Sequence, residues 1–280
     1  MKTPVPRVLQ FIGYVSLFWC WLQIPSAASG LPAPLELEDL TWTELRDRIA
    51  GGTTTILIPI GGTEQNGPAM ALGKHNVRVR FLAEKIAARL GNALVAPVVA
   101  YVPEGNIDPP TGHMKFPGTI SITDQAFRSL LEQAARSFRH QGFKTIVLLG
   151  DHGGYQASEA AVARRLNREW KHKPARVFAD LDFYTITQKA YVEKLLNAGV
   201  NKKDVGTHAS LADISLMLAI DPSMVRQERL AGGAKFGPVD GVYGGDPSRS
   251  SAALGQLGVD AIVGGTTTAI QAFVAKQPPG

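Results

Sequence analysis

The 280-residue sequence predicts a single α/β domain in which a mostly parallel central sheet is covered by helices on both faces. Short apolar, β-branched runs alternate along the chain with amphipathic stretches of helical period. This alternation is typical of parallel sheets with helices on each side. No long linker, internal repeat or low-complexity segment divides the chain, so we expect one domain rather than two.

Residues 1–28 have the pattern of an export signal and are set apart from this fold. Lys2 and Arg7 give a positive beginning, residues 8–24 are apolar, and residues 26–28 (Ser-Ala-Ala) are small enough for cleavage. The apolar stretch is short for a membrane span, so we expect cleavage and a periplasmic or secreted protein without a stable span. A retained membrane anchor is the alternative.

Composition limits the remaining 252 residues further. Cys20 is the only cysteine, so the domain after residue 28 has no disulfide and depends on its core for stability. No small residue precedes Cys20, which makes a lipoprotein the weaker alternative. Removal of Lys2 and Arg7 lowers the net charge from +5 to +3, too little to indicate nucleic-acid binding, and no basic cluster is interleaved with aromatic residues.

The elements are expected in a regular order. A helix carrying Trp42, Leu45 and Ile49 comes first, capped by Asp39 or Thr41. Four strands are expected at residues 54–60, 94–99, 145–149 and 177–181. Further helices are expected at residues 77–90, 124–140, 157–170, 183–198 and 209–219 and within 252–275, with long loops at 102–117 and 232–250.

The end of the first strand is the most informative segment. Residues 54–60 run into two glycines, and Glu64 follows at the carboxyl end of the strand, where open α/β sheets build their active sites. His75 follows eleven residues later, just before an amphipathic stretch. Glu64 and His75 are therefore the first candidates for a polar site, and a metal site is the leading interpretation.

The strand at 145–149 ends in the same manner, in Gly150-Asp151-His152-Gly153-Gly154. Glycines around His152 let the backbone come close to a bound group, which favours a ligand or acid–base role over that of a plain loop histidine. Asp151 could instead orient an imidazole by hydrogen bonding.

Three further positions carry open alternatives. Asp213 is either a functional carboxylate or a solvated one at the start of a helix, and His208 is either a proton donor in the same cleft or a capping residue. His113 lies in a loop rich in proline and glycine, where it binds substrate, shapes the pocket wall or has a structural role. His140 and His172 lie at helix ends among charges and are expected to face solvent.

Six spaced segments together resemble the creatininase (creatinine amidohydrolase) family of metal-dependent amidohydrolases. They occur in the family's order, at residues 58–68, 72–75, 117–121, 150–154, 208–218 and 244–247. The resemblance implies an α/β domain with a two-metal centre that hydrolyses cyclic or other non-peptide amides, or in some members peptides. It also implies a homo-oligomer, often a hexamer.

The chain departs from the family pattern at several positions. The family's Glu-Gln-His-Gly-Pro-His is here Glu64-Gln65-Asn66-Gly67-Pro68-Ala69. His75 stands where the family places a metal-bridging aspartate, Tyr155 replaces an asparagine, and Asp213 replaces a glutamate. A carboxylate bridges two cations, whereas a neutral imidazole offers one lone pair, so one metal position should be weakened.

The sequence thus predicts a hydrolase of a C–N bond in a small amide, cyclic amides included, that uses one or two Zn²⁺ or Mn²⁺ ions. The expected metal ligands are Glu64, His75, His152 and Asp213. His208 is expected to protonate the leaving nitrogen and Asp151 or Asp213 to take a proton from water, while Asn66, His113 and Tyr155 contact the substrate. The alternatives are a periplasmic binder of a small molecule or metal that has lost catalysis, and a peptidase.

Overall fold

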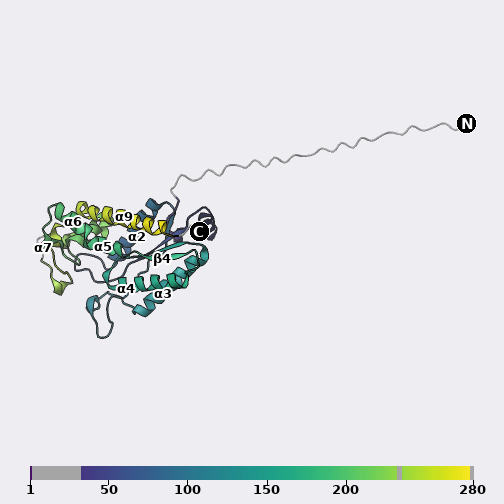
Figure 1. Cartoon of the computed structure of the whole chain (residues 1–280). Helices are drawn as coiled ribbons and strands as arrows, with labels where there is room; N and C mark the ends of the chain where they lie inside the picture. The colour runs from purple at the N-terminus through teal and green to yellow at the C-terminus, as the bar shows by residue number, and fades with distance from the viewer. Residues whose placement is uncertain (2–32, 232–234, 278–280) are drawn as a thin grey trace. The chain divides into compact units, whose positions relative to one another are not determined.

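Apart from Met1, the computed structural model describes residues 33–231 and 235–277 (Figure 1). The domain considered below begins at Pro34. The expected export signal lies outside the described residues and stays a prediction.

A four-stranded parallel sheet forms the centre of the domain. The strands are β1 (Thr55–Ile60), β2 (Ala93–Val95), β3 (Thr145–Gly150) and β4 (Arg176–Ala179), in the order β2-β1-β3-β4. In β1 and β3 all six residues are buried, which is why both read as continuous apolar runs in the sequence. The predicted parallel α/β fold is confirmed.

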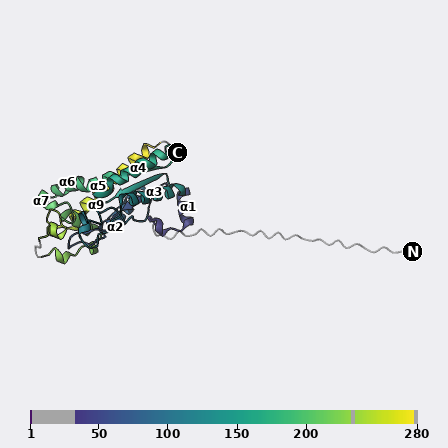
Figure 2. The same ribbon diagram turned by 90° about the horizontal axis from the view of Figure 1, so that it is seen from below.

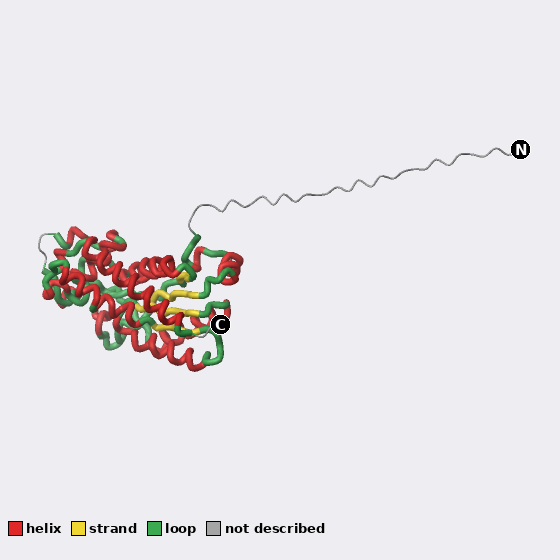
Figure 3. The backbone as a smooth tube through the Cα atoms, turned by 45° about the horizontal axis from the view of Figure 1, so that its top comes forward, coloured by secondary structure: helices red, strands yellow, loops and turns green. Residues whose placement is uncertain are grey.

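Helices cover both faces of this sheet, as Figures 1 to 3 show. Alternate strand residues such as Leu57 and Val147 pack into one core, and their neighbours Ile56 and Ile146 pack into the other. The first face carries α2 (Lys74–Leu90), α5 (Leu181–Gln188), α6 (Ala190–Asn197), α8 (Leu211–Ile220) and α9 (Ala252–Ala275). The second carries α1 (Trp42–Ala50), α3 (Asp124–Gln141) and α4 (Gln156–Glu169).

Several element boundaries differ from the expected ones for local reasons. Strand β2 ends early because Pro97 has no N–H, and the Val99 N–H then pairs with the Pro59 carbonyl. Strand β4 ends at Ala179 because Asp180 caps α5 through the Asp182 N–H. The expected helix at 183–198 is two helices that meet at Lys189, and a short helix α7 (Lys202–Val205) follows.

The cap of α1 shows how one of two expected start signals prevails. The Thr41 hydroxyl accepts from the Glu44 N–H, and the Glu44 carboxylate accepts from the Thr41 N–H at 2.7 Å. This reciprocal capping box satisfies two backbone donors of the first turn. Thr41 rather than Asp39 therefore starts the helix.

Helix α9 is long and apolar enough to cross a membrane, the one such helix among the described residues. It packs against α2, α5, α6 and α8 in the domain. At Gly255 a Cβ atom would lie 1.8 Å from the Ser215 carbonyl oxygen, so glycine is required where α9 meets α8. These contacts are those of a core helix.

The strand order also determines where a site can form. From β1 the chain crosses to β2 on one side, and β3 pairs with β1 on the other side. The loops after β1 and β3 therefore separate at the carboxyl edge of the sheet and leave a crevice between them. Glu64 follows β1, and Asp151 and His152 follow β3.

Candidate metal centre and active site

Glu64 is the centre of the site. Its side chain is 0% exposed and follows two glycines at the end of β1. Gly62 has φ +145°, and a Cβ there would lie 2.5 Å from Glu104 Oε1, so only glycine allows the chain to turn beside that carboxylate. The Glu64 carboxylate is thereby held inside the domain at the sheet edge.

Four imidazoles from four different segments surround this carboxylate. His75 Nε2 lies 2.7 Å from Oε1 and His208 Nδ1 3.7 Å from Oε1. His113 Nε2 lies 3.2 Å and His152 Nε2 3.6 Å from Oε2. The structure thus brings together residues that the sequence placed separately in four motifs.

Glu104 is a second buried carboxylate on the Oε2 side, and the sequence analysis missed it. It is 4% exposed, and His152 Nδ1 lies 3.6 Å from its Oε2. Burial and the nearby Glu64 carboxylate raise the pKa of Glu104 to about 9. The sequence feature that could have identified Glu104 is a carboxylate placed between Pro103 and Gly105, in the loop that follows β2 at the same edge of the sheet.

The imidazoles facing Oε2 and the cavity are held neutral. Burial is the main cause, and it lowers the pKa of His152 to about 4 and that of His208 to about 3, with the Lys74 ammonium adding to the effect for both. Burial also lowers the pKa of His113. Neutral imidazoles are the form in which histidine binds metal ions.

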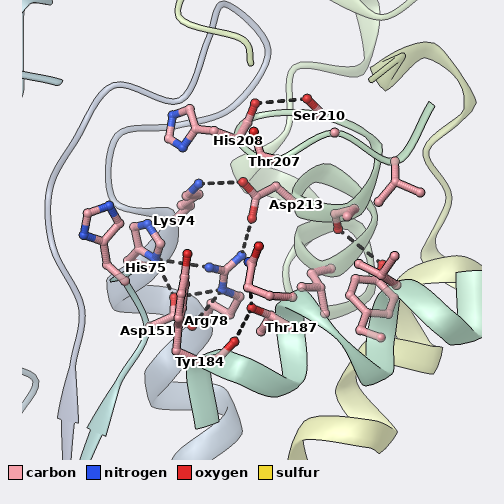
Figure 4. A pocket seen from close by; sticks show the side chains of 18 of the residues that line it. Lys74, His75, Arg78, Asp151, Tyr184, Thr187, Thr207, His208, Ser210 and Asp213 are labelled. Atoms are coloured by element: carbon pink, nitrogen blue, oxygen red, sulfur yellow. Dashed lines mark hydrogen bonds and ion pairs between the residues drawn. The ribbon is translucent and has the colours of Figure 1, made fainter. Parts of the chain in front are cut away.

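Lys74 and Arg78, one turn apart on α2, bring two cations to the carboxylates of Asp151 and Asp213 (Figure 4). Lys74 Nζ lies 2.9 Å from Asp213 Oδ2 and 3.5 Å from Glu64 Oε1. Arg78 donates from Nε to Asp151 at 2.8 Å and from Nη1 to Asp213 Oδ1 at 2.8 Å. The sequence analysis did not single out either cation, because a lysine and an arginine near a helix start read as solvent-facing.

His75 joins the two sides. Its Nε2 faces Glu64, and its Nδ1 lies 2.5 Å from Asp151 Oδ2. Both ring nitrogens thus face carboxylate oxygens rather than the cavity. Asp151 in turn is 1% exposed and held by Arg78, an arrangement that fits the orienting role considered for it.

Asp213 is fixed by three donors. Besides Lys74 and Arg78, the Ala209 N–H donates to Oδ2 at 2.9 Å. Ala209 has φ +52°, a left-handed conformation unusual for alanine, and it is the reason α8 starts at Leu211 rather than at 209. Burial would raise the pKa of Asp213, but Lys74 and Arg78 hold that pKa well below its usual value. As a metal ligand Asp213 stays a prediction, since both of its oxygens already face cations.

Gln65 is a further residue that the motif contained without an assigned role. Its Nε2 lies 3.0 Å from both His113 Nδ1 and His208 Nε2, and it donates to the Gly241 carbonyl at 3.1 Å. The amide nitrogen has two hydrogens for these three acceptors, so it donates to at most two of them at a time, and through it one amide contacts both imidazoles beside Glu64.

Two residues expected to contact substrate lie elsewhere. Tyr155 is fully buried, and its hydroxyl donates to the carbonyls of Ile60 and Gly61 at 2.9 and 2.7 Å. Asn66 is 1% exposed, and its amide donates to the carbonyls of Glu64 and Ala71. Both positions support the backbone around Glu64. His113, in contrast, lines the cavity.

The residues present suit a divalent cation. Two groups bring ligand atoms within 4.8 Å of one another, Glu64 with His113 and His208, and Glu64 with Glu104 and His152. Within the part of the chain that the structure describes, Glu64 Oε2 and both Glu104 oxygens are buried without a hydrogen-bond partner. Buried carboxylate oxygens without donors are costly, and a cation between them would satisfy them. Glu64 and His152 belong both to these groups and to the ligand set predicted from sequence.

A cavity of about 190 Å³ opens beside the centre (Figure 4). Its polar lining includes His113, His152 and His208 together with the hydroxyl groups of Tyr184, Thr187 and Thr207. Pockets for drug-sized ligands have volumes of roughly 300 to 1,000 Å³, so this cavity suits a smaller molecule.

The fold and the site define an α/β protein with a candidate metal centre at the carboxyl edge of a parallel sheet. Residues 38–270 match the family described as Creatininase: Creatinine amidohydrolase. The chain therefore belongs to the creatininase family.

Known relatives differ in what they act on. The chain is 26% identical over 204 residues to a 3-dehydro-scyllo-inosose hydrolase of Thermotoga maritima, and the aligned part is 70% of this chain and 60% of that protein. It is 28% identical over 223 residues to a creatinine amidohydrolase of Pseudomonas putida, covering 76% and 83%. It is 29% identical over 224 residues to a mycofactocin precursor peptide peptidase of Mycolicibacterium smegmatis, covering 78% and 76%.

Solved structures show the same fold. A manganese form of creatininase superposes with a TM-score of 0.69 at 24% identity, and a zinc–zinc form of a creatininase variant with a TM-score of 0.68 at 24% identity. They cover 88% and 89% of this chain and all of the solved chains. At this identity the likeness establishes the fold.

Proposed function

We propose that the protein is a metal-dependent hydrolase of a C–N bond in a small amide, cyclic amides such as creatinine included. The observation that carries the proposal is the Glu64 carboxylate, which is buried among four imidazoles and whose Oε2 has no hydrogen-bond partner among the described residues. Membership of the creatininase family and the small cavity support the same class of reaction.

The metal ligands are proposed to be Glu64 with His113 and His208, or Glu64 with Glu104 and His152, holding one ion or two. Mixed imidazole and carboxylate sets suit Zn²⁺ and Mn²⁺, and relatives of known structure are described as manganese and zinc–zinc forms. A bound ion of this kind polarises a carbonyl and lowers the pKa of a bound water toward ~7.

The chain's own side chains would orient the substrate and move protons. Tyr184, Thr187 and Thr207 present hydroxyl groups to the cavity, and burial raises the pKa of Tyr184, which keeps its proton in place as a donor. If the ion is held by Glu64, Glu104 and His152, His208, which starts neutral, would take a proton from the attacking water and pass it to the leaving nitrogen; in the other case His208 is itself a ligand. Asp151 acts through His75, which it orients against Glu64.

Metal analysis and hydrolysis assays test this proposal. Purified protein should contain at least one Zn²⁺ or Mn²⁺ per chain and should hydrolyse creatinine or a related lactam. Chelation should remove the activity and readdition of the ion should restore it. Protein that binds neither ion and hydrolyses none of the amides would refute the proposal.

A family member that binds a small molecule or metal without catalysis is the second candidate. This candidate is favoured by Lys74, because its ammonium pairs with the carboxylates of Glu64 and Asp213, which would otherwise be free to bind metal ions. Stoichiometric metal binding without hydrolysis of any amide or short peptide would select it. Cleavage of peptides but not of lactams would instead select a peptidase-like activity, as in one relative.

We also propose that the protein is exported and assembles into a homo-oligomer, a hexamer by family resemblance. Export is supported by the sequence pattern of residues 1–28 alone. Fractionation of cells that produce the full chain should place it in the periplasm or medium with residues 1–28 removed, and light scattering should give a mass near six chains. Protein that stays in the cytoplasm or keeps residues 1–28 would contradict export with cleavage, and monomeric protein would contradict the homo-oligomer.

A further inference from the structure

Lys74 is the least expected group in the site. It is 1% exposed, although a lysine is almost never fully buried without a partner. Its Nζ has two carboxylates as neighbours, Asp213 at 2.9 Å and Glu64 at 3.5 Å. These carboxylates come from distant segments, the loop after β1 and helix α8.

This position is one that a metal ion could otherwise take. Pairs of carboxylates that converge from separate elements often bind metal ions in proteins, and here the cation between them is the Lys74 ammonium. An additional divalent ion between Glu64 Oε1 and Asp213 Oδ2 would have to lie next to the ammonium, in the same small space. A divalent ion and an ammonium group in direct contact repel each other strongly in a buried site.

The charge balance points the same way. Asp213 and Asp151 are neutralised by Lys74 and Arg78, which contact them directly. Among the described residues of this cluster, the carboxylate oxygens without a hydrogen-bond partner lie on the opposite side, on Glu64 and Glu104. In this cluster, that is the side on which carboxylate oxygens are still open to a cation.

We propose that the Lys74 ammonium fills a cation position between Glu64 and Asp213, so that the centre takes one divalent ion fewer than its carboxylates could hold. The remaining ion then binds on the Oε2 side of Glu64, a part that rests on the proposed function.

The test is to remove the ammonium and count ions. Lys74→Met keeps the length of the side chain and leaves two facing carboxylates. After equilibration with Mn²⁺ alone and gel filtration, elemental analysis should find about one more ion per chain in Lys74→Met than in wild-type protein. In EDTA the variant should melt roughly 10 °C lower, because a buried ion pair has lost one partner, and Mn²⁺ should restore most of that loss.

Two variants serve as controls. Lys85 lies on the same helix but is exposed, so Lys85→Met should change neither the ion count nor the melting temperature by more than about 2 °C. Adding Asp213→Asn to Lys74→Met removes one of the two carboxylates, and the additional ion should disappear. An unchanged ion count in Lys74→Met, or a gain that survives Asp213→Asn, would overturn the proposal.

Wild-type protein provides a measurement that does not depend on a folded variant. Crystals soaked in Mn²⁺ should show no anomalous density between Glu64 and Asp213, and a peak there would overturn the proposal. The proposed function fails separately: wild-type protein that takes no ion and hydrolyses nothing refutes it, whereas a gain of one ion in Lys74→Met still supports the role of Lys74.

Discussion

The two sides of Glu64 differ in how their charges are balanced. On the paired side, towards Oε1, the carboxylates of Asp151 and Asp213 each contact a cation of the protein. On the open side, towards Oε2, Glu104 and Glu64 have buried oxygens without donors, surrounded by neutral imidazoles. The paired side is neutralised by cations of the protein itself, whereas the open side needs either a proton on Glu104 or a cation from outside.

This difference separates stability from function within one small cluster. Removing a group from the paired side leaves a buried charge unpaired and should destabilise the fold. Removing a carboxylate from the open side removes a group that must keep a proton when no cation is bound, and it should weaken ion binding. The predictions below test this contrast.

The largest effect is expected from Glu64→Gln, because both candidate ligand groups contain Glu64. Bound metal should fall to near zero, and hydrolysis should fall by more than about 100-fold, since even the hydrogen-bonding partners of ligands contribute 10- to 100-fold. Elemental analysis and kinetics measure this. Glu159→Gln, at another fully buried glutamate outside these groups, should keep its metal. Equal loss in both variants would contradict the assignment.

Arg78→Met should be the most destabilising change on the paired side. Asp151 and Asp213 both lose a hydrogen-bonded partner, at a cost of about 3–5 kcal/mol in the free energy of unfolding. Urea denaturation of metal-free protein measures it. The exposed Arg165, paired with Glu132, is the matched control, and Arg165→Met should cost at most about 1 kcal/mol. A similar small cost for Arg78→Met would remove the distinction between the two sides.

Glu104→Gln should have a smaller effect on stability, and one that depends on pH. The pKa of Glu104 is raised to about 9, so between about pH 4.5 and 9 the folded chain holds a proton that the unfolded chain has lost. Stability of the metal-free protein therefore falls as pH rises through this window, by up to about 1.4 kcal/mol per pH unit from this group.

Glu104→Gln should flatten that pH dependence and weaken ion binding by about 10- to 100-fold. Urea unfolding at a series of pH values, together with a metal titration, measures both effects. A wild-type slope that is unchanged in Glu104→Gln would show that Glu104 does not carry the raised pKa.

The smallest effect is expected from Tyr155→Phe, which removes one buried hydroxyl. The carbonyls of Ile60 and Gly61 lose its hydrogen bonds, at a cost of about 1 kcal/mol, while ion binding stays within about twofold. Thermal melting and metal titration measure these. Loss of substrate affinity without loss of stability would instead support the substrate contact expected from sequence.

The fold was predictable because the spacing of apolar residues reflects which positions are buried, and because glycines mark the ends of helices and strands. Strands β1 and β3 and helix α3 begin and end within a residue or two of the expected positions. The expected strand 94–99 is cut short at Pro97, and the helix expected from residue 209 is delayed by the positive φ of Ala209. Both depend on backbone geometry that the apolar pattern does not record.

The site was predictable only in part. Glu64 and His152 follow strand ends, where position alone indicates function. Glu104 and Lys74 lie in segments with no pattern of their own, and their importance comes from what the fold places beside them. His75 and Asp213 were recognised as polar site residues, but their partners, Asp151 and the two cations of α2, are contacts across the tertiary structure.

The candidate ligands are spread widely along the chain, from Glu64 to His208, and four of the five lie in loops that share no hydrogen-bonded strand. An ion bound there would cross-link these loops, because side chains from several of them would coordinate it. Local opening of any one loop would then require the ion to leave, so bound metal should slow amide hydrogen exchange and proteolysis across loops far apart in sequence.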